Sequence, residues 1–298
     1  MNSQAQESAM ATTTRTADYR CFLLCLSCLF WGFHSHAAIG DEPPTAEHSS
    51  PQITSNVVQY AGEQTLHYAS AGDSAKPGLL FIHGTPGSWS AFKGYLEHPQ
   101  LSANYFMVSV DRPGWGKSAV SKEQKKSSLG FDAQATAIAH VMTEYPDKKW
   151  VVIGHSLGAS IAPKVGLVAP DRVVGLLLLA GSLQPKLGKP RWYNRFANNR
   201  LLKWMLPSHL NYSNDEIMVL RRELTAMENQ LLAKQAPIDL VIIQGMKDKL
   251  VSPKNAGYVE AHWADAYASV RTIELPDAGH FIPWEQFSLV VETIFEFN

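Results

Sequence analysis

The feature that most constrains this chain is a series of short, continuous apolar runs separated by longer, more polar segments. Runs without polar alternation predict strands that are buried on both faces. They occupy residues 78–84, 105–111, 149–155, 173–181 and 239–245, with a hairpin expected over 57–62 and 65–70 before them and a last strand over 269–276. Strands that alternate with helical segments predict an α/β fold, with a mostly parallel sheet and helices on both faces.

One segment, residues 183–236, breaks this alternation because it contains no run typical of a strand. Its two helical stretches predict a helical insertion between two strands, and Ser213 or Asn214 is the expected N-cap of the second helix. The sheet and its helices are therefore assigned to residues 53–182 and 237–298.

The insertion carries several aromatic rings and a group of acidic side chains. Trp192, Phe196 and Trp204 either pack the insertion onto the sheet domain or line an apolar substrate pocket. The acidic side chains look like a solvated helix face; they are Asp215, Glu216, Glu223 and Glu228.

Charge and cysteine content exclude several classes of function. The 298 residues include 26 Lys and Arg against 27 Asp and Glu, which gives a formal net charge of −1. A near-neutral chain has no basic field for nucleic acid, so we expect a small or neutral substrate as its partner. Cys21, Cys25 and Cys28 all lie in one N-terminal apolar run, so a mature chain without that run has no cysteine chemistry.

The N-terminal region predicts export. Residues 21–33 form an apolar run that has the length of a signal-peptide core and is shorter than the about 20 residues of a membrane span. Small residues follow at the −3 and −1 positions of a cut after Ala37. We predict a signal peptide over residues 1–37, a flexible leader over 38–52 and a periplasmic or secreted protein. An uncleaved membrane anchor formed by residues 21–33 is the alternative.

The sequence Gly-His-Ser-Leu-Gly, residues 154–158, follows a predicted strand and precedes a helical segment. In this context G-x-S-x-G is typical of a nucleophile elbow, where small flanking residues are needed because neighbouring chains crowd the turn. We predict that Ser156 is a nucleophile at a helix N-terminus. Pro163 should kink or shorten that helix.

A serine nucleophile needs a base, and the base needs an orienting acid. His280 follows the last predicted strand, and the neighbouring Gly279 frees the backbone to present it. Asp248 is the first carboxylate after strand 239–245. We therefore predict Ser156, Asp248 and His280 as the catalytic residues, whereas His155 is expected to pack beside the serine.

The oxyanion of a tetrahedral intermediate needs two backbone donors. Leu157 N–H directly follows the serine and is one of them. The glycine-rich loop 83–89 should supply the other, and because Pro86 has no N–H, Thr85 is the expected donor. Neither glycine pattern of phosphate-binding loops is present, so phosphate binding is not expected. The glycine turn 111–118 is expected to brace the loops around the site.

Five segments occur in the order HGTPGSW, DRPGWGKS, GHSLG, QGMKDKLVSP and DAGHFIPWE. Together they resemble the α/β-hydrolase superfamily, in the branch with a helical cap, over roughly residues 53–298. The resemblance implies an eight-stranded, mostly parallel sheet, a cap at residues 183–236 after the sixth strand, and no metal or organic cofactor. Epoxide hydrolases and haloalkane dehalogenases of this superfamily have an aspartate where this chain has Ser156, so their chemistries are disfavoured.

The leading hypothesis is an exported serine hydrolase that cleaves carboxylic esters of small to medium apolar substrates through an acyl-enzyme. Its pocket is expected at Trp89, Phe281 and the three cap aromatics. Two enzymatic alternatives stay open: a carbon–carbon bond hydrolase, and a peptidase, because HGTPG is similar to the HGGPG of proline iminopeptidases. A ligand-binding protein that keeps the fold without turnover is an alternative from another class.

Overall fold

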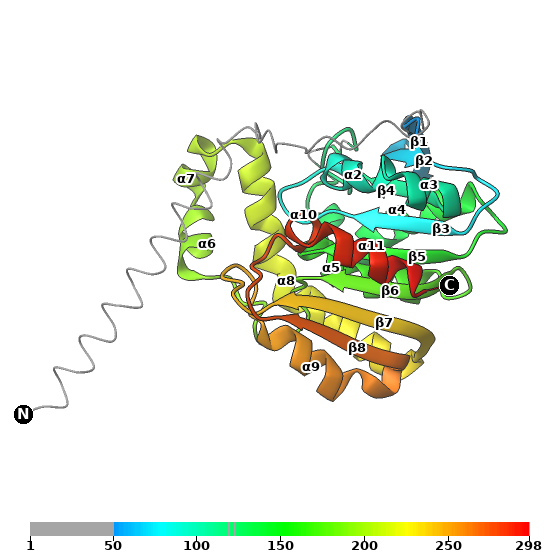
Figure 1. Ribbon diagram of the computed structural model, residues 1–298. Coiled ribbons are helices and arrows are strands. Elements are labelled where there is room, and N and C mark those ends of the chain that lie inside the picture. The colour runs from blue at the N-terminus through cyan, green and yellow to red at the C-terminus, as the bar shows by residue number, and fades with distance from the viewer. Residues whose placement is uncertain (1–50, 119, 122, 298) are drawn as a thin grey trace, which may run out of the picture. The chain divides into compact units, whose positions relative to one another are not determined.

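The computed structural model describes residues 51–118, 120–121 and 123–297. The predicted signal peptide, the alternative anchor and nearly all of the predicted leader lie outside the described residues. Among the helices of the described range, none is both long and apolar enough to cross a bilayer. One sheet with helices on both faces organises this part of the chain (Figure 1).

The sheet has eight strands in the spatial order β1-β2-β4-β3-β5-β6-β7-β8. They are β1 Thr54–Ala61, β2 Gln64–Ala71, β3 Gly78–Ile82, β4 Phe106–Val110, β5 Trp150–His155, β6 Val173–Leu179, β7 Ala236–Gly245 and β8 Tyr267–Leu275. Strand β2 is antiparallel to β1 and to β4, and the other pairings are parallel. The predicted mostly parallel eight-stranded sheet is confirmed.

Helices and short 3₁₀ turns fill the connections. They are η1 Trp89–Phe92, α2 Lys93–Leu96, α3 Pro99–Asn104, η2 Ser127–Leu129, α4 Phe131–Thr143, α5 Leu157–Val168, α6 Trp192–Ala197, α7 Arg200–Met205, α8 Ser208–Lys234, α9 Lys254–His262, η3 Ala264–Ala266, α10 Ile282–Glu285 and α11 Phe287–Phe295. The carboxyl ends of β3, β5 and β7 lie at the edge of the sheet that faces α6 and α8 (Figure 1).

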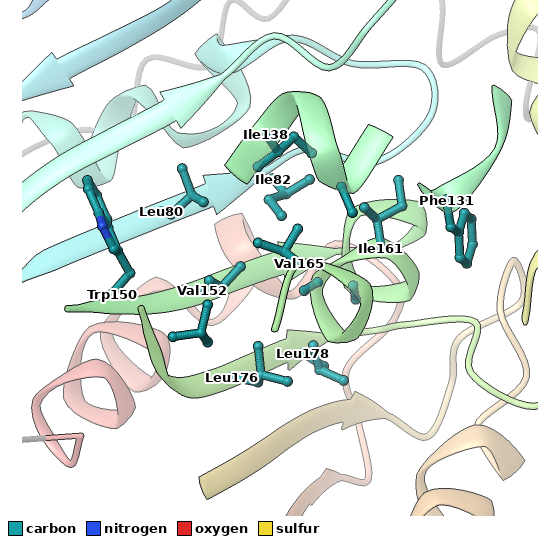
Figure 2. Packing of buried hydrophobic residues seen from close by; sticks show 14 of the residues in the cluster. Leu80, Ile82, Phe131, Ile138, Trp150, Val152, Ile161, Val165, Leu176 and Leu178 are labelled. Carbon is teal, nitrogen blue, oxygen red and sulfur yellow. The ribbon is translucent and has the colours of Figure 1, made fainter. Parts of the chain in front are cut away.

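Two hydrophobic cores cover the two faces of the sheet, because alternate residues of a strand point to opposite faces. Leu80 and Ile82 of β3 pack in the core that α4 and α5 cover (Figure 2). Leu79 and Phe81 of the same strand belong to the other core, which α2, α3 and α11 cover. The continuous apolar runs in the sequence therefore reflect strands that are buried on both sides.

Three helices, α6, α7 and α8, follow β6 at the position predicted for the cap. The expected N-cap of the long helix was wrong, because α8 begins at Ser208 and runs through Ser213 and Asn214. The Asn214 amide is buried and pairs instead with Asn194 on α6, with Asn194 Nδ2 donating to Asn214 Oδ1 over 3.0 Å. An interhelical amide pair thus takes the place of the predicted cap.

Pro163 lies inside α5 without shortening it. The helix continues from Leu157 to Val168, past the proline. The proline removes one backbone donor, but almost every residue of this helix is buried between the sheet, α4 and α8, and that packing holds the helix together.

Candidate active site

Ser156 lies at the sharp turn between β5 and α5. Its φ of 55° and ψ of −117° place a non-glycine residue in a strained backbone conformation. A Cβ at Gly154 would lie 2.4 Å from Gly158 O, and a Cβ at Gly158 would lie 2.1 Å from Ile82 O. Both positions therefore require glycine, and the crowding expected at the turn is confirmed.

The structure brings Ser156, His280 and Asp248 together from the ends of β5, β8 and β7. His280 Nε2 lies 3.1 Å from Ser156 Oγ, and His280 Nδ1 lies 2.7 Å from Asp248 Oδ2. Asp248 and His280 are buried, whereas Ser156 is half-buried and accessible to a substrate. These contacts form one continuous line of hydrogen bonds from carboxylate to hydroxyl.

The protons along this line can be assigned from its partners. Asp248 Oδ1 accepts the backbone N–H groups of Leu250 and Val251, at 2.8 and 2.9 Å, which fixes the carboxylate. Its other oxygen then accepts from His280 Nδ1–H. The lone pair of His280 Nε2 is left facing Ser156, whose hydroxyl donates to it. In this tautomer the imidazole is ready to take the serine proton.

His155 lies beside the serine and supports the loop of His280. Its Nε2–H donates to the backbone carbonyl of His280 over 3.0 Å, and the two rings are 4.9 Å apart. Burial, followed by the nearby His280, lowers the pKa of His155 to about 3, so the ring is neutral at neutral pH. The expected packing role is confirmed, and the hydrogen bond to the His280 loop adds to it.

The loop after β3 passes directly over the serine. A Cβ at Gly84 would lie 3.0 Å from Ser156 Cβ, so the backbone approaches as closely as a glycine allows. The carbonyl of Gly84 accepts from Arg112 Nη2 at 2.8 Å and from His83 Nδ1 at 2.7 Å. Because a trans peptide is planar, Thr85 N–H points away from these donors. Leu157 is the first residue of α5, so its N–H has no acceptor within the helix.

Arg112 is the fully buried centre of a polar network behind this loop. Its Nε donates to His83 O over 2.9 Å, and its Nη1 lies 2.5 Å from Glu216 Oε1 and 2.6 Å from Gln134 Oε1. Glu216 belongs to cap helix α8, and Gln134 to α4. Arg112 therefore connects the loop over the serine to the cap.

The expectation of a solvated acidic face on the cap was wrong. Glu216 and Glu223 are buried, and Glu223 Oε2 accepts Phe131 N–H over 2.9 Å. Glu228 Oε1 accepts from Trp263 Nε1 and from the Tyr258 hydroxyl. Buried carboxylates need such partners, and these partners are on the sheet domain. These three glutamates therefore attach the cap to the sheet domain, whereas Asp215 pairs with Lys203 within the cap.

The glycine turn after β4 braces the site, as predicted. Asp111 is buried, and its carboxylate accepts Trp89 N–H at 2.8 Å, Lys117 N–H at 2.9 Å and His67 Nδ1–H at 2.8 Å. The bond to Trp89 holds the start of η1, which directly follows the loop that passes over Ser156. His83 contributes from the same side, since Arg112 N–H donates to its Nε2 over 3.1 Å. Burial holds the pKa of His83 well below its usual range.

The five predicted pocket residues divide into two groups. Phe281 follows His280 directly, with the two rings 5.7 Å apart, and Trp89 is half-buried at the start of η1. The cap aromatics are exposed: Trp192 by 45%, Phe196 by 62% and Trp204 by 83%. The sequence prediction missed Trp284, whose ring lies 5.1 Å from His155 and whose Nε1–H donates to Ala91 O.

Residues 51–297, apart from the two undescribed positions, contain no group of three His, Cys, Asp or Glu side chains able to hold a metal. The expectation of a reaction without metal or organic cofactor stays a prediction.

The sequence matches the Alpha/beta hydrolase family over residues 79–293. This match covers most of the chain, from β3 to α11, and the chain belongs to this family. The fold and the predicted recognition agree with it.

Several known proteins are similar to this chain. A 2-hydroxy-6-oxononadienedioate/2-hydroxy-6-oxononatrienedioate hydrolase 2 of Pseudomonas putida is 34% identical over 119 residues, 39% of this chain and 40% of that protein. The AB hydrolase superfamily protein YfhM of Bacillus subtilis is 29% identical over 115 residues, 39% of each chain. This chain thus spans about two fifths of the length of these relatives.

A soluble epoxide hydrolase of Corynebacterium sp. is 24% identical over 83% of this chain and 98% of its own. Among solved structures, Cfl2 from Burkholderia cenocepacia superposes with a TM-score of 0.64 at 17% identity, over 82% of this chain and 95% of its own. At this identity the structural likeness shows the fold alone.

Proposed function

We propose that this protein is a serine hydrolase that cleaves carboxylic esters of small to medium apolar substrates through an acyl-enzyme. The observation that carries the proposal is the line of hydrogen bonds from Asp248 through His280 to Ser156, with the loop of Gly84 directly above the serine. A hydroxyl that donates to the Nε2 lone pair of a correctly oriented imidazole is an activated nucleophile.

The geometry supports the following steps. Ser156 Oγ attacks the ester carbonyl while His280 Nε2 takes its proton, and Asp248 stabilises the resulting imidazolium. The N–H groups of Thr85 and Leu157 bind the oxyanion. His280 then gives the proton to the leaving alcohol. Water repeats the sequence on the acyl-enzyme and releases the acid, which restores Ser156.

Epoxide hydrolysis is disfavoured on chemical grounds, although several relatives carry that name. Attack of a serine oxygen on an epoxide carbon gives an ether. An ether has no carbonyl for water to attack, so the enzyme would be consumed after one event. A carboxylate nucleophile gives an ester instead, which water can cleave. Ser156 therefore favours substrates with a carbonyl group.

Carbon–carbon bond hydrolysis is the second candidate, and the similarity to the Pseudomonas putida hydrolase favours it. Ser156 would attack a ketone carbonyl, and the leaving group would be a carbanion equivalent that needs a proton. A substrate such as that relative's dienedioate also carries carboxylates, whereas Arg112, the buried cation behind the site, is already paired with Glu216. Because Arg112 is paired, it is not available to bind a substrate carboxylate. This favours an ester as the substrate over a dienedioate.

A peptidase that recognises a substrate amine has less support. Such an enzyme needs free carboxylates near the nucleophile, but the four acidic cap residues have partners: Glu216, Glu223 and Glu228 on the sheet domain, and Asp215 with Lys203. The apolar run at residues 21–33 supports export as a further part of the proposal.

Initial rates on p-nitrophenyl esters, from acetate to palmitate, test the proposal. We expect turnover by the wild-type protein and a loss of roughly 10⁴–10⁶-fold in kcat for Ser156→Ala. Ser160→Ala is the matched control, since Ser160 lies one helical turn away and its hydroxyl donates only to backbone carbonyls. Turnover of a 2-hydroxy-6-oxo-dienoate without any ester turnover would instead assign the carbon–carbon hydrolase.

A further inference from the structure

Two short cap helices present apolar side chains to solvent. Five of them are exposed by 45–83%: Trp192, Phe196, Leu201, Trp204 and Met205. They lie within α6 and α7, which stand outermost in the cap at the left of Figure 1. We call these five side chains the cap face. Large exposed apolar side chains gathered on two consecutive short helices point to a docking surface.

The charge around the cap face is as unusual as its apolar content. Residues 183–210 contain six Lys and Arg residues and neither Asp nor Glu, although the whole chain has a net charge of −1. Four of the basic side chains are exposed: Lys186, Lys189, Arg195 and Arg200. The segment that carries the cap face is therefore positively charged, on a chain that is net negative.

This combination identifies the kind of partner. Aromatic and aliphatic side chains flanked by Lys and Arg are the composition of helices that lie in the interface of anionic membranes. A second copy docked through the same patch would bring two sets of basic side chains together. Nucleic acid would bind the charges but would not cover Leu201 and Met205. An anionic phospholipid surface satisfies both features.

The start of α6 is also linked to the loop that holds Asp248. Arg191, the residue before α6, donates from Nη2 to the carbonyls of Lys249 and Leu250, at 3.2 and 3.1 Å. Leu250 N–H in turn donates to Asp248 Oδ1. A surface that carried the cap face would therefore lie close to the loop that orients His280.

We propose that the cap face docks on anionic phospholipid membranes. We infer the substrate class from this docking together with the proposed ester hydrolysis, on which this inference about the substrate rests. The substrate is then an amphiphilic ester that partitions into the bilayer. Such a substrate would reach Ser156 from the membrane surface.

Vesicle sedimentation tests the docking. The chain is used from Ala38 onward, to leave out the apolar run at 21–33, and this form contains the complete core, which begins at Val58. The vesicles are phosphatidylcholine alone or mixed with phosphatidylglycerol. We expect binding to the mixed vesicles only, with weaker binding at high salt.

Two double variants and two controls locate the surface. Arg195→Gln with Arg200→Gln should weaken binding about 25-fold, since each basic residue near an anionic surface contributes about fivefold. Phe196→Ser with Trp204→Ser should weaken it tenfold or more. The controls, Lys126→Gln with Lys254→Gln and Val57→Ser, change exposed residues on other elements and should bind like the wild type.

Equal binding by the wild type and both cap variants, or no binding to mixed vesicles, would overturn the proposal. So would self-association of the wild type that the Trp204→Ser change abolishes without any vesicle binding, which would make a second copy the partner. Turnover of p-nitrophenyl acetate is measured for the arginine variant and for both controls and should not change. A wild type without ester turnover would refute the proposed function but leave the vesicle result intact.

Discussion

Arg112 and Glu216 form a buried ion pair that joins the loop above Ser156 to the longest helix of the cap. Arg112 Nη1 and Glu216 Oε1 are 2.5 Å apart, and both side chains are excluded from solvent. The same guanidinium donates to the carbonyls of His83 and Gly84. The orientation of the Gly84–Thr85 peptide, and with it the proposed oxyanion donor, therefore depends on a residue of the cap.

Glu216→Gln should lower the stability of the protein and slow its ester hydrolysis. The change leaves the Arg112 charge buried without its carboxylate, which costs about 3–5 kcal/mol of unfolding free energy. If the loop shifts, kcat should fall by up to about 10²-fold, the cost of one oxyanion donor, with little change in KM. Urea unfolding and p-nitrophenyl ester kinetics measure the two effects.

The exposed cap pair provides the control for this prediction. Lys203 and Asp215 form an ion pair on the same helical cap, but both side chains are partly exposed. Breaking it with Asp215→Asn should cost about 0–1 kcal/mol and leave kcat unchanged. If Glu216→Gln behaved like Asp215→Asn in both measurements, the buried pair would have no positioning role.

Stability should fall with acid because His155 is buried and neutral. Its pKa is lowered to about 3, whereas an unfolded histidine titrates near 6.5. Between these values the unfolded chain binds a proton that the folded chain does not, so the free energy of unfolding falls as the pH falls from about 6.5 toward 3. Burial of His83 acts in the same direction.

His155→Gln isolates that contribution. The glutamine amide can still donate to the His280 carbonyl, but it does not titrate. Urea unfolding at several pH values should give a shallower slope for the variant, by about one proton per molecule, and lower kcat if the His280 loop shifts. Identical slopes for the two proteins would mean that His155 is already neutral in the unfolded chain or charged in the folded one.

Gly158→Ala should disrupt the elbow. Its new Cβ would lie 2.1 Å from the Ile82 carbonyl oxygen, which belongs to a buried strand and has no room to move. We expect a lower melting temperature and loss of ester turnover. Gly257→Ala is the control, because Gly257 lies in α9 with open space around it. That change should raise stability by about 0.5–1 kcal/mol and leave turnover intact.

Asn255→Ala should loosen the start of the cap. The buried Asn255 amide accepts the backbone N–H groups of Leu183 and Gln184, both at 2.8 Å, where the chain leaves β6 toward the cap. Removing the acceptor leaves two donors unsatisfied and should cost about 2–3 kcal/mol. Hydrogen exchange should show faster exchange at 183 and 184 than in the wild type; unchanged protection there would contradict this anchoring role.

The sheet and the arrangement of the candidate site could be predicted because their signals are local. Each buried strand is one apolar run, and the glycines at 154 and 158 flank Ser156 in the sequence itself. The end of each parallel strand lies at one edge of the sheet, so a serine, an aspartate and a histidine that follow three strands come together. The line of hydrogen bonds followed from that rule.

The cap could not be predicted as well because its contacts are long-range. Glu216 lies on the same helical stripe as Leu220, Leu224 and Met227, and this spacing is the signal that it is buried. Its partner Arg112 is 104 residues away in sequence, so nothing local indicates the pair. The exposed faces of α6 and α7 were missed for a related reason. On a short helix, the sequence pattern of an apolar residue does not show whether its side chain packs against the sheet domain or faces solvent.

The most direct test of the account is whether Ser156 carries the acyl group. The protein is mixed with p-nitrophenyl acetate, quenched in acid within the first turnover and digested, and the peptide that contains residues 154–158 is analysed by mass spectrometry. The account predicts one acetyl group on Ser156, and none in the Ser156→Ala variant. Ester turnover with the acetyl group on another residue, or with an unmodified Ser156 at every quench time, would contradict it.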